Sequence, residues 1–70
     1  MKVADFKIGD IVEDQYENII EVCKKGIHKK HGPWLEVGFT NGEIDRYWDD
    51  PKHESFPDET DVKTLKRFEE

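Results

Sequence analysis

Cysteine is nearly absent from this sequence, and other features that define large classes of protein are missing as well. The single thiol, Cys23, permits no internal disulfide, which fits a reducing compartment. No apolar run is long enough to span a bilayer. The start of the chain, Met1–Asp5, lacks the apolar core of a signal peptide. We therefore expect a cytoplasmic protein with no membrane segment.

Apolar residues are also scarce, at 34% against 40% charged residues. A chain of 70 residues allows one domain, residues 1–70, with a thin core. Such a small domain buries only ~60% of its unfolded surface, so its stability is modest. The aromatic content of 11% and several β-branched runs nevertheless predict a folded domain rather than a disordered chain.

Positive charge is scarce and is concentrated in one segment. The net charge is −6, but residues 22–34 carry four lysines and no acid, whereas residues 35–50 carry five acids and one arginine. An acidic body argues against broad contact with a phosphate backbone, which usually needs a basic face. The simplest consequence of the acidic charge is solubility.

The strongest local signal is Asn41-Gly42, which predicts a β-hairpin closed by a two-residue turn. That register pairs Phe39 with Ile44 and Leu35 with Trp48. One face of the hairpin then carries the core side chains Leu35, Val37, Phe39, Ile44 and Trp48. The other face carries the exposed side chains Trp34, Glu36, Thr40, Glu43, Asp45 and Tyr47.

The remaining pattern predicts further short strands. Residues 10–14 and 19–24 read as strands because they are rich in β-branched residues. Residues 25–33 read as a basic loop with Gly26, Gly32 and Pro33, and residues 49–60 as a long polar loop. Val62 and Leu65 are three positions apart, which favours a 3₁₀ turn followed by a last strand over residues 65–68. A C-terminal helix from Asp58 to Glu69 is the alternative.

Five strands with a 3₁₀ turn before the last predict a small closed barrel, since closure removes exposed sheet edges. Three segments, Ile8–Val12, Leu35–Glu43 and Asp61–Leu65, resemble the SH3-like barrels, and within them the Tudor- and KOW-type modules. The chain is also similar to small proteins of bacteriophages, prophages and their bacterial hosts. The alternative fold is a β-meander with a C-terminal helix.

The resemblance implies two kinds of binding. Tudor-type modules hold a methylated cation in an aromatic cage with a nearby acid. The candidate cage residues here are Tyr16, Trp34, Tyr47 and Trp48, with Asp45 or Asp49 as the acid. KOW-type modules bind RNA or protein, and the matching segment would be the basic loop with Lys24, Lys25, Lys29 and Lys30.

Metal binding and catalysis lack a workable pattern. Cys23, His28 and His31, with His53 as a fourth ligand, match no zinc-finger spacing, and the neighbouring lysines repel a dication. No nucleophile elbow, ordered triad or phosphate-binding glycine loop is present in the sequence. We therefore expect no metal, no cofactor and no enzymatic activity.

The sequence thus predicts a small protein-interaction module that is a monomer or a weak homodimer. We expect a basic protein partner to bind the exposed face of the central hairpin. The predicted contact residues are Tyr16, Trp34, Asp45, Tyr47 and Asp49. The alternative is binding of RNA or another nucleic acid by the basic loop.

Overall fold

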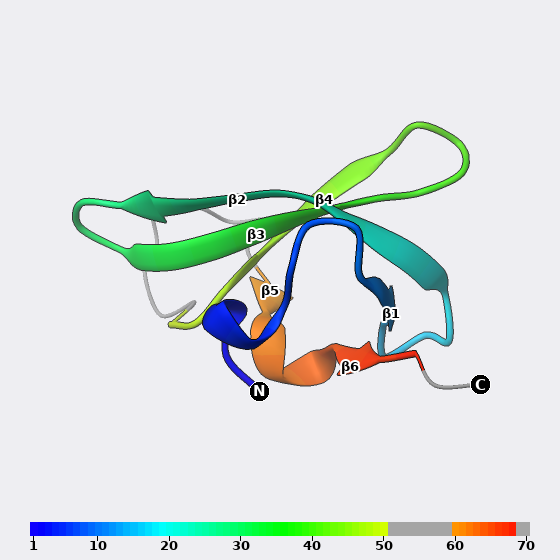
Figure 1. Ribbon diagram of the computed structural model, residues 1–70, viewed down its shortest axis with the longest axis horizontal. Coiled ribbons are helices and arrows are strands. Elements are labelled where there is room, and N and C mark those ends of the chain that lie inside the picture. Colours follow the sequence, from blue (N-terminus) through cyan, green and yellow to red (C-terminus); the bar gives the residue numbers. More distant parts are fainter. Residues whose placement is uncertain (51–59, 69–70) are drawn as a thin grey trace.

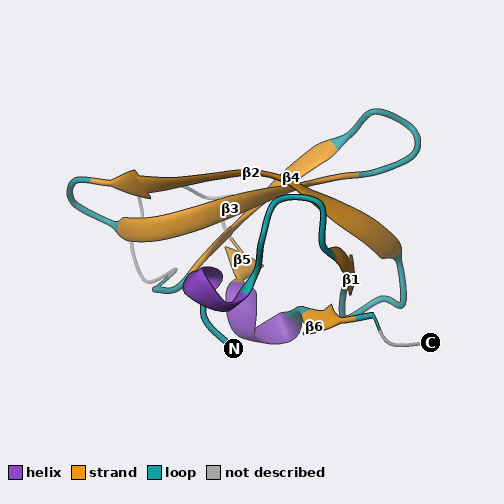
Figure 2. Cartoon of the chain, viewed as in Figure 1, coloured by secondary structure: helices purple, strands orange, loops and turns teal. Residues whose placement is uncertain are grey.

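The computed structural model describes residues 1–50 and 60–68. These residues form an all-β fold in which one six-stranded sheet curls into a half-barrel (Figure 1). The elements in chain order are η1 (Val3–Asp5), β1 (Ile11–Glu13), β2 (Ile19–His28), β3 (Gly32–Gly38), β4 (Ile44–Trp48), β5 (Thr60–Asp61), η2 (Val62–Thr64) and β6 (Lys66–Arg67). Both η elements are single 3₁₀ turns (Figure 2).

The order of the strands explains the curl. It is β5-β4-β3-β2-β1-β6, so β5 and β6 lie at opposite ends of the sheet although only η2 and Leu65 separate them in sequence. The short connection draws the two ends together. This arrangement is compatible with an SH3-like barrel, and the prediction of a small all-β fold is confirmed.

The last described segment also decides between strand and helix. Val62 begins the 3₁₀ turn that its spacing to Leu65 predicted, and Asp61 Oδ1 caps that turn by accepting from Lys63 N at 2.9 Å. β6 then pairs with β1. The alternative of a C-terminal helix is therefore wrong for residues 60–68, and most of the predicted loop over residues 49–60 lies outside the described residues.

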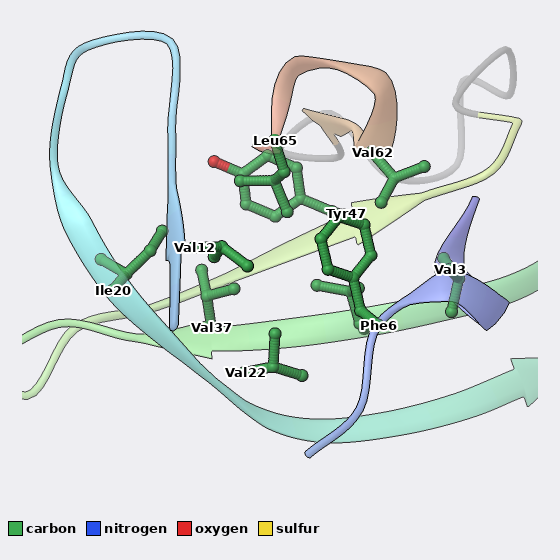
Figure 3. Packing of buried hydrophobic residues seen from close by; sticks show 10 residues of the cluster. Val3, Phe6, Val12, Ile20, Val22, Val37, Tyr47, Val62 and Leu65 are labelled. Carbon is green, nitrogen blue, oxygen red and sulfur yellow. The ribbon is translucent and has the colours of Figure 1, made fainter. Parts of the chain in front are cut away.

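The core lies between the concave face of the sheet and the two 3₁₀ turns (Figure 3). The buried side chains that form it are Val3, Phe6, Val12, Ile20, Val22, Leu35, Val37, Tyr47, Val62 and Leu65. Val3 and Phe6 come from the N-terminal segment, while Val62 and Leu65 come from the C-terminal one. Both ends of the chain are thus needed to cover the sheet.

The central hairpin differs from the prediction by one residue. Gly38, and not Phe39, pairs with Ile44, because the loop has three residues, Thr40 to Gly42. Phe39 N donates to Glu43 O at 2.9 Å, and among the loop residues only Gly42 has a positive φ, of 90°. A three-residue loop with a left-handed glycine is a common hairpin closure. The one-residue shift exchanges the two faces of β4.

The β2–β3 hairpin is longer than predicted. β2 continues to His28 and β3 begins at Gly32, so the predicted loop over residues 25–33 shrinks to residues 29–31. The glycines and proline that suggested a loop fit this pairing. The ring of Trp34 lies on Gly26, and Pro33 points its carbonyl to Asp49 N at 3.3 Å. Long-range pairing has overridden the local loop signal.

A β-bulge at Cys23 bends β2. Val22 pairs with Val37, but the next pair along is Lys24 with Glu36. The extra residue reverses the faces of the end of β2, so that Lys25 rather than Lys24 shares the core-side face with Leu35.

No helix among the described residues has the length and apolar character to cross a membrane.

Candidate functional site

Tyr47 lies in the core and not on the surface. Only 4% of this residue is exposed, because the register of β4 turns it toward the concave face. Burial raises the pKa of Tyr47, and the negative charges of Asp14 and Asp45 raise it further, to about 12. The prediction that Tyr47 is an exposed contact residue is therefore wrong.

The titration of Tyr47 tests this placement. In a Tyr16→Phe variant Tyr47 is the only tyrosine. We expect its ultraviolet tyrosinate signal well above the ordinary value of 10.0, because burial, the largest cause of the raised pKa, remains in this variant. The unfolded chain loses this proton at a lower pH than the folded protein does. The contribution of Tyr47 to the free energy of unfolding should therefore be fully present below pH 10.0 and be lost as the pH rises through the folded pKa. Adding Tyr47→Phe should remove that loss, and a tyrosinate signal near pH 10.0 in the folded protein would contradict the burial.

Trp34 is already in contact with a cation. Its ring lies against Gly26, where an added Cβ would come within 2.3 Å of Trp34 Cζ2. The guanidinium carbon of Arg46 stands 4.1 Å from the ring centroid of Trp34. Arg46 also donates from Nε to Glu36 Oε2 at 3.0 Å. Arg46 thus occupies the face of Trp34 on which a cationic ligand would bind, and Glu36 is already paired with it.

Trp48 is fully buried, but on the convex side of the sheet rather than in the main cluster. The ring centroids of His28, His31 and Trp34 lie 6.1, 6.3 and 6.5 Å from its own. Burial of Trp48 agrees with the prediction, but its side of the sheet does not. This second aromatic cluster packs against the turn end of the β2–β3 hairpin.

The other predicted contact residues lie apart from this cluster. Tyr16 is 75% exposed in the β1–β2 turn, and Asp45 is exposed at the start of β4. The carboxylate of Asp49 accepts from Val3 N at 2.7 Å and so fixes η1 to the end of β4. With Tyr47 buried and Trp34 stacked beneath Arg46, these residues do not build an aromatic cage.

The four lysines of the basic segment point in different directions. Lys24 is exposed on the convex face, while Lys25 on the concave face donates from Nζ to Phe6 O at 2.6 Å. Lys29 and Lys30 are exposed in the hairpin loop. The structure therefore brings together only part of the predicted nucleic-acid patch.

The thiol and the imidazoles of this region also have structural roles. His28 Nδ1 accepts from Lys30 N at 3.1 Å and from His31 N at 3.2 Å, which orders the loop. Cys23 Sγ lies 3.5 Å from Glu36 O. Among residues 1–50 and 60–68 no three His, Cys, Asp or Glu side chains meet in an arrangement that could hold a metal ion. His53 lies outside the described residues.

Sequence reasoning missed an apolar hollow on the convex face. We call it the Gly38 hollow. It has a volume of about 300 Å³ and is lined by Ile11, Ile19, Ile20, Glu21, Gly38, Phe39 and Thr40. Ile44 pairs with Gly38 at its side and is 60% exposed. The alternation of β4 contained this signal, but the wrong register assigned Ile44 to the core.

Acidic side chains accompany the Gly38 hollow. Glu21 lines it from β2 and is exposed, and Glu43 is exposed next to Ile44. Asp45 is also exposed, but it pairs with the buried Val37 and therefore lies on the concave side of the sheet, away from Ile44. Comparisons with protein-family models, curated proteins and solved structures found no match to this chain.

Proposed function

We propose that this chain is a non-enzymatic protein-interaction module that binds a basic protein partner through the outer face of the central hairpin. The observation that carries the proposal is the Gly38 hollow, where Ile11, Ile19 and Ile44 expose aliphatic surface around a glycine floor. Apolar side chains inside a charged rim are the usual energetic plan of a binding patch.

The acidic charge around the Gly38 hollow indicates that the partner is positively charged. Glu21 and Glu43 are exposed at this end of the sheet, and the chain as a whole carries a net charge of −6. Such a surface attracts a basic partner and speeds association at low salt. Trp34, which the sequence suggested as one of the contact residues, contributes instead by holding Arg46 and the hairpin in place.

The experiment uses synthetic peptides in which one aliphatic side chain is flanked by lysine and arginine, titrated into the isotope-labelled protein. We expect amide shifts at Glu21, Gly38 and Ile44. Ile44→Ser should weaken binding about tenfold, which corresponds to losing the burial of one aliphatic side chain. Ile27→Ser is the matched control, because Ile27 is even more exposed but lies on the other hairpin.

Two results would contradict the proposal. One is that no such peptide shifts these amides at low salt. The other is that Ile44→Ser and Ile27→Ser weaken binding equally, since binding would then not involve the Gly38 hollow.

The finer predictions from the sequence remain proposals beside this one. They include a Tudor- or KOW-type relationship, a bacterial or phage origin, a cytoplasmic location and a monomer or weak homodimer. RNA binding by Lys24, Lys25, Lys29 and Lys30 stays the alternative function, supported by the acid-free stretch over residues 22–34. The bond from Lys25 Nζ to Phe6 O speaks against full use of that patch.

A further inference from the structure

One edge of β2 is open over its second half. β1 pairs with β2 only over residues 19–21, and two further bonds join Val22 to Gly9 and Asp10. After Val22, β3 covers one edge of β2, and within the described ranges 1–50 and 60–68 no strand pairs with the other. This end of the hairpin projects beyond the rest of the sheet (Figure 1).

The backbone groups that face the open edge follow from the alternation of the strands. Phe39 N donates to Glu43 O and Pro33 O accepts from Asp49 N, so the odd-numbered residues of β3 face β4. The even-numbered residues of β3, which include Trp34, therefore face β2. Because a strand residue has its N–H and C=O on the same edge, this fixes the direction of each β2 partner.

By the same alternation, the backbone groups of two residues of β2 face outward. Gly26 pairs with Trp34 and Lys24 with Glu36, so both turn their N–H and C=O groups toward β3. Lys25 and Ile27 lie between and beyond them and turn theirs to the open edge. These are the groups that an added strand would use.

An apolar hollow adjoins this edge. It has a volume of about 340 Å³ and is lined by Val3, Ala4, Lys25, Gly26, Ile27 and Pro33. Ile27 is 79% exposed beside it. Because Lys25 and Ile27 belong both to the hollow and to the open edge, a strand paired with β2 would place alternate side chains next to the hollow.

The charge of the segment selects the occupant. Residues 22–34 hold four lysines and no acid. Two copies joined edge to edge would bring two lysine-rich segments together, and this charge repulsion disfavours self-pairing. We propose that the edge of β2 over Lys25 and Ile27 takes up an extended acidic peptide by strand addition, with an aliphatic side chain in the hollow. This surface is separate from the Gly38 hollow and has the opposite charge.

The test is selection from a random peptide library displayed on phage, with the wild-type chain as bait. We expect the selected peptides to alternate acidic and aliphatic residues. A synthetic peptide of the selected sequence should slow hydrogen exchange at the amides of Lys25 and Ile27, with which no described strand pairs on this edge. This measurement uses the wild-type chain, so it tests the proposed site even if a variant fails to fold.

Variants at Ile27 complete the experiment. Ile27→Pro removes an edge donor without removing a bond to β3, and should weaken binding of the selected peptide at least about tenfold. Ile27→Thr keeps the N–H and a strand-forming side chain, so it should retain most of the affinity. Ile44→Ser should have no effect, which separates this site from the proposed function.

Several outcomes would overturn the strand-addition site. They are selected peptides without acidic residues, unchanged exchange at Lys25 and Ile27 in the complex, or equal effects of Ile27→Pro and Ile27→Thr. Two further results would also overturn it. One is that RNA, and no peptide, binds at the amides of Lys25 and Ile27. The other is that self-association of the chain protects those amides.

Discussion

Replacing Phe6 by alanine is expected to lower the free energy of unfolding by about 3–5 kcal/mol. Phe6 is fully buried among the core side chains although it precedes the first strand. Its removal leaves a cavity between the N-terminal segment and the sheet. A domain of this size has a total stability of roughly 3.5–10 kcal/mol, so the variant should lose from about a third to all of it.

Urea unfolding followed by tryptophan fluorescence measures this loss, because both tryptophans lie on the sheet. Ile8→Ala is the matched control. Ile8 is two residues away and 65% exposed, so its truncation should change stability by no more than about 0.5 kcal/mol. Equal midpoints for the two variants would show that the N-terminal segment does not close the core.

Replacing Asp14 by alanine should open the β1–β2 turn. Asp14 Oδ1 accepts from Tyr16 N at 2.9 Å and from Asn18 N at 2.8 Å, and Oδ2 accepts from Asn18 Nδ2 at 3.0 Å. The turn also holds Glu17 at a positive φ of 67°. We expect the free energy of unfolding to fall by about 1.5–3 kcal/mol, which is the range for one hydrogen bond to a charged group.

The pH dependence of Asp14 has a definite sign. Burial raises its pKa, but the hydrogen bonds from Asn18 and Tyr16 outweigh this and hold it below the ordinary value of 3.8. Stability from this group is therefore present above pH 3.8 and is lost as pH falls through the lower folded pKa.

The Asp14→Asn variant isolates the charge, because it keeps one acceptor oxygen of similar geometry. At neutral pH the wild type should be more stable than this variant in chemical unfolding. The difference should narrow well below pH 3.8, where the wild-type carboxyl is protonated. A difference that stays constant across that range would mean that the ionised carboxylate does not hold the turn.

The two proposed surfaces give this small domain opposite charges at two places. Glu21 and Glu43 lie around the Gly38 hollow, while Lys25 and its neighbours line the edge of β2. One chain could then hold a basic and an acidic partner at once. The separate variants at Ile44 and Ile27 distinguish the two surfaces.

The sequence by itself determined the class of fold and most of its elements. The β-branched alternation in residues 10–24 and the three-residue spacing of Val62 and Leu65 depend on neighbours along the chain. Composition likewise predicted a thin core. These features are local or global averages, and neither requires knowledge of which residues meet in space.

Only the tertiary structure decided the register and therefore the surface. Asn41-Gly42 is compatible with a two-residue turn and with a three-residue loop, and the structure has the second, with Tyr47 packed into the core. In the same way, Trp34 on Gly26 extends the β2–β3 hairpin through a segment that reads locally as loop. Because a strand exchanges faces with every residue of shift, a small local ambiguity moved Ile44 to the outside and Tyr47 to the inside.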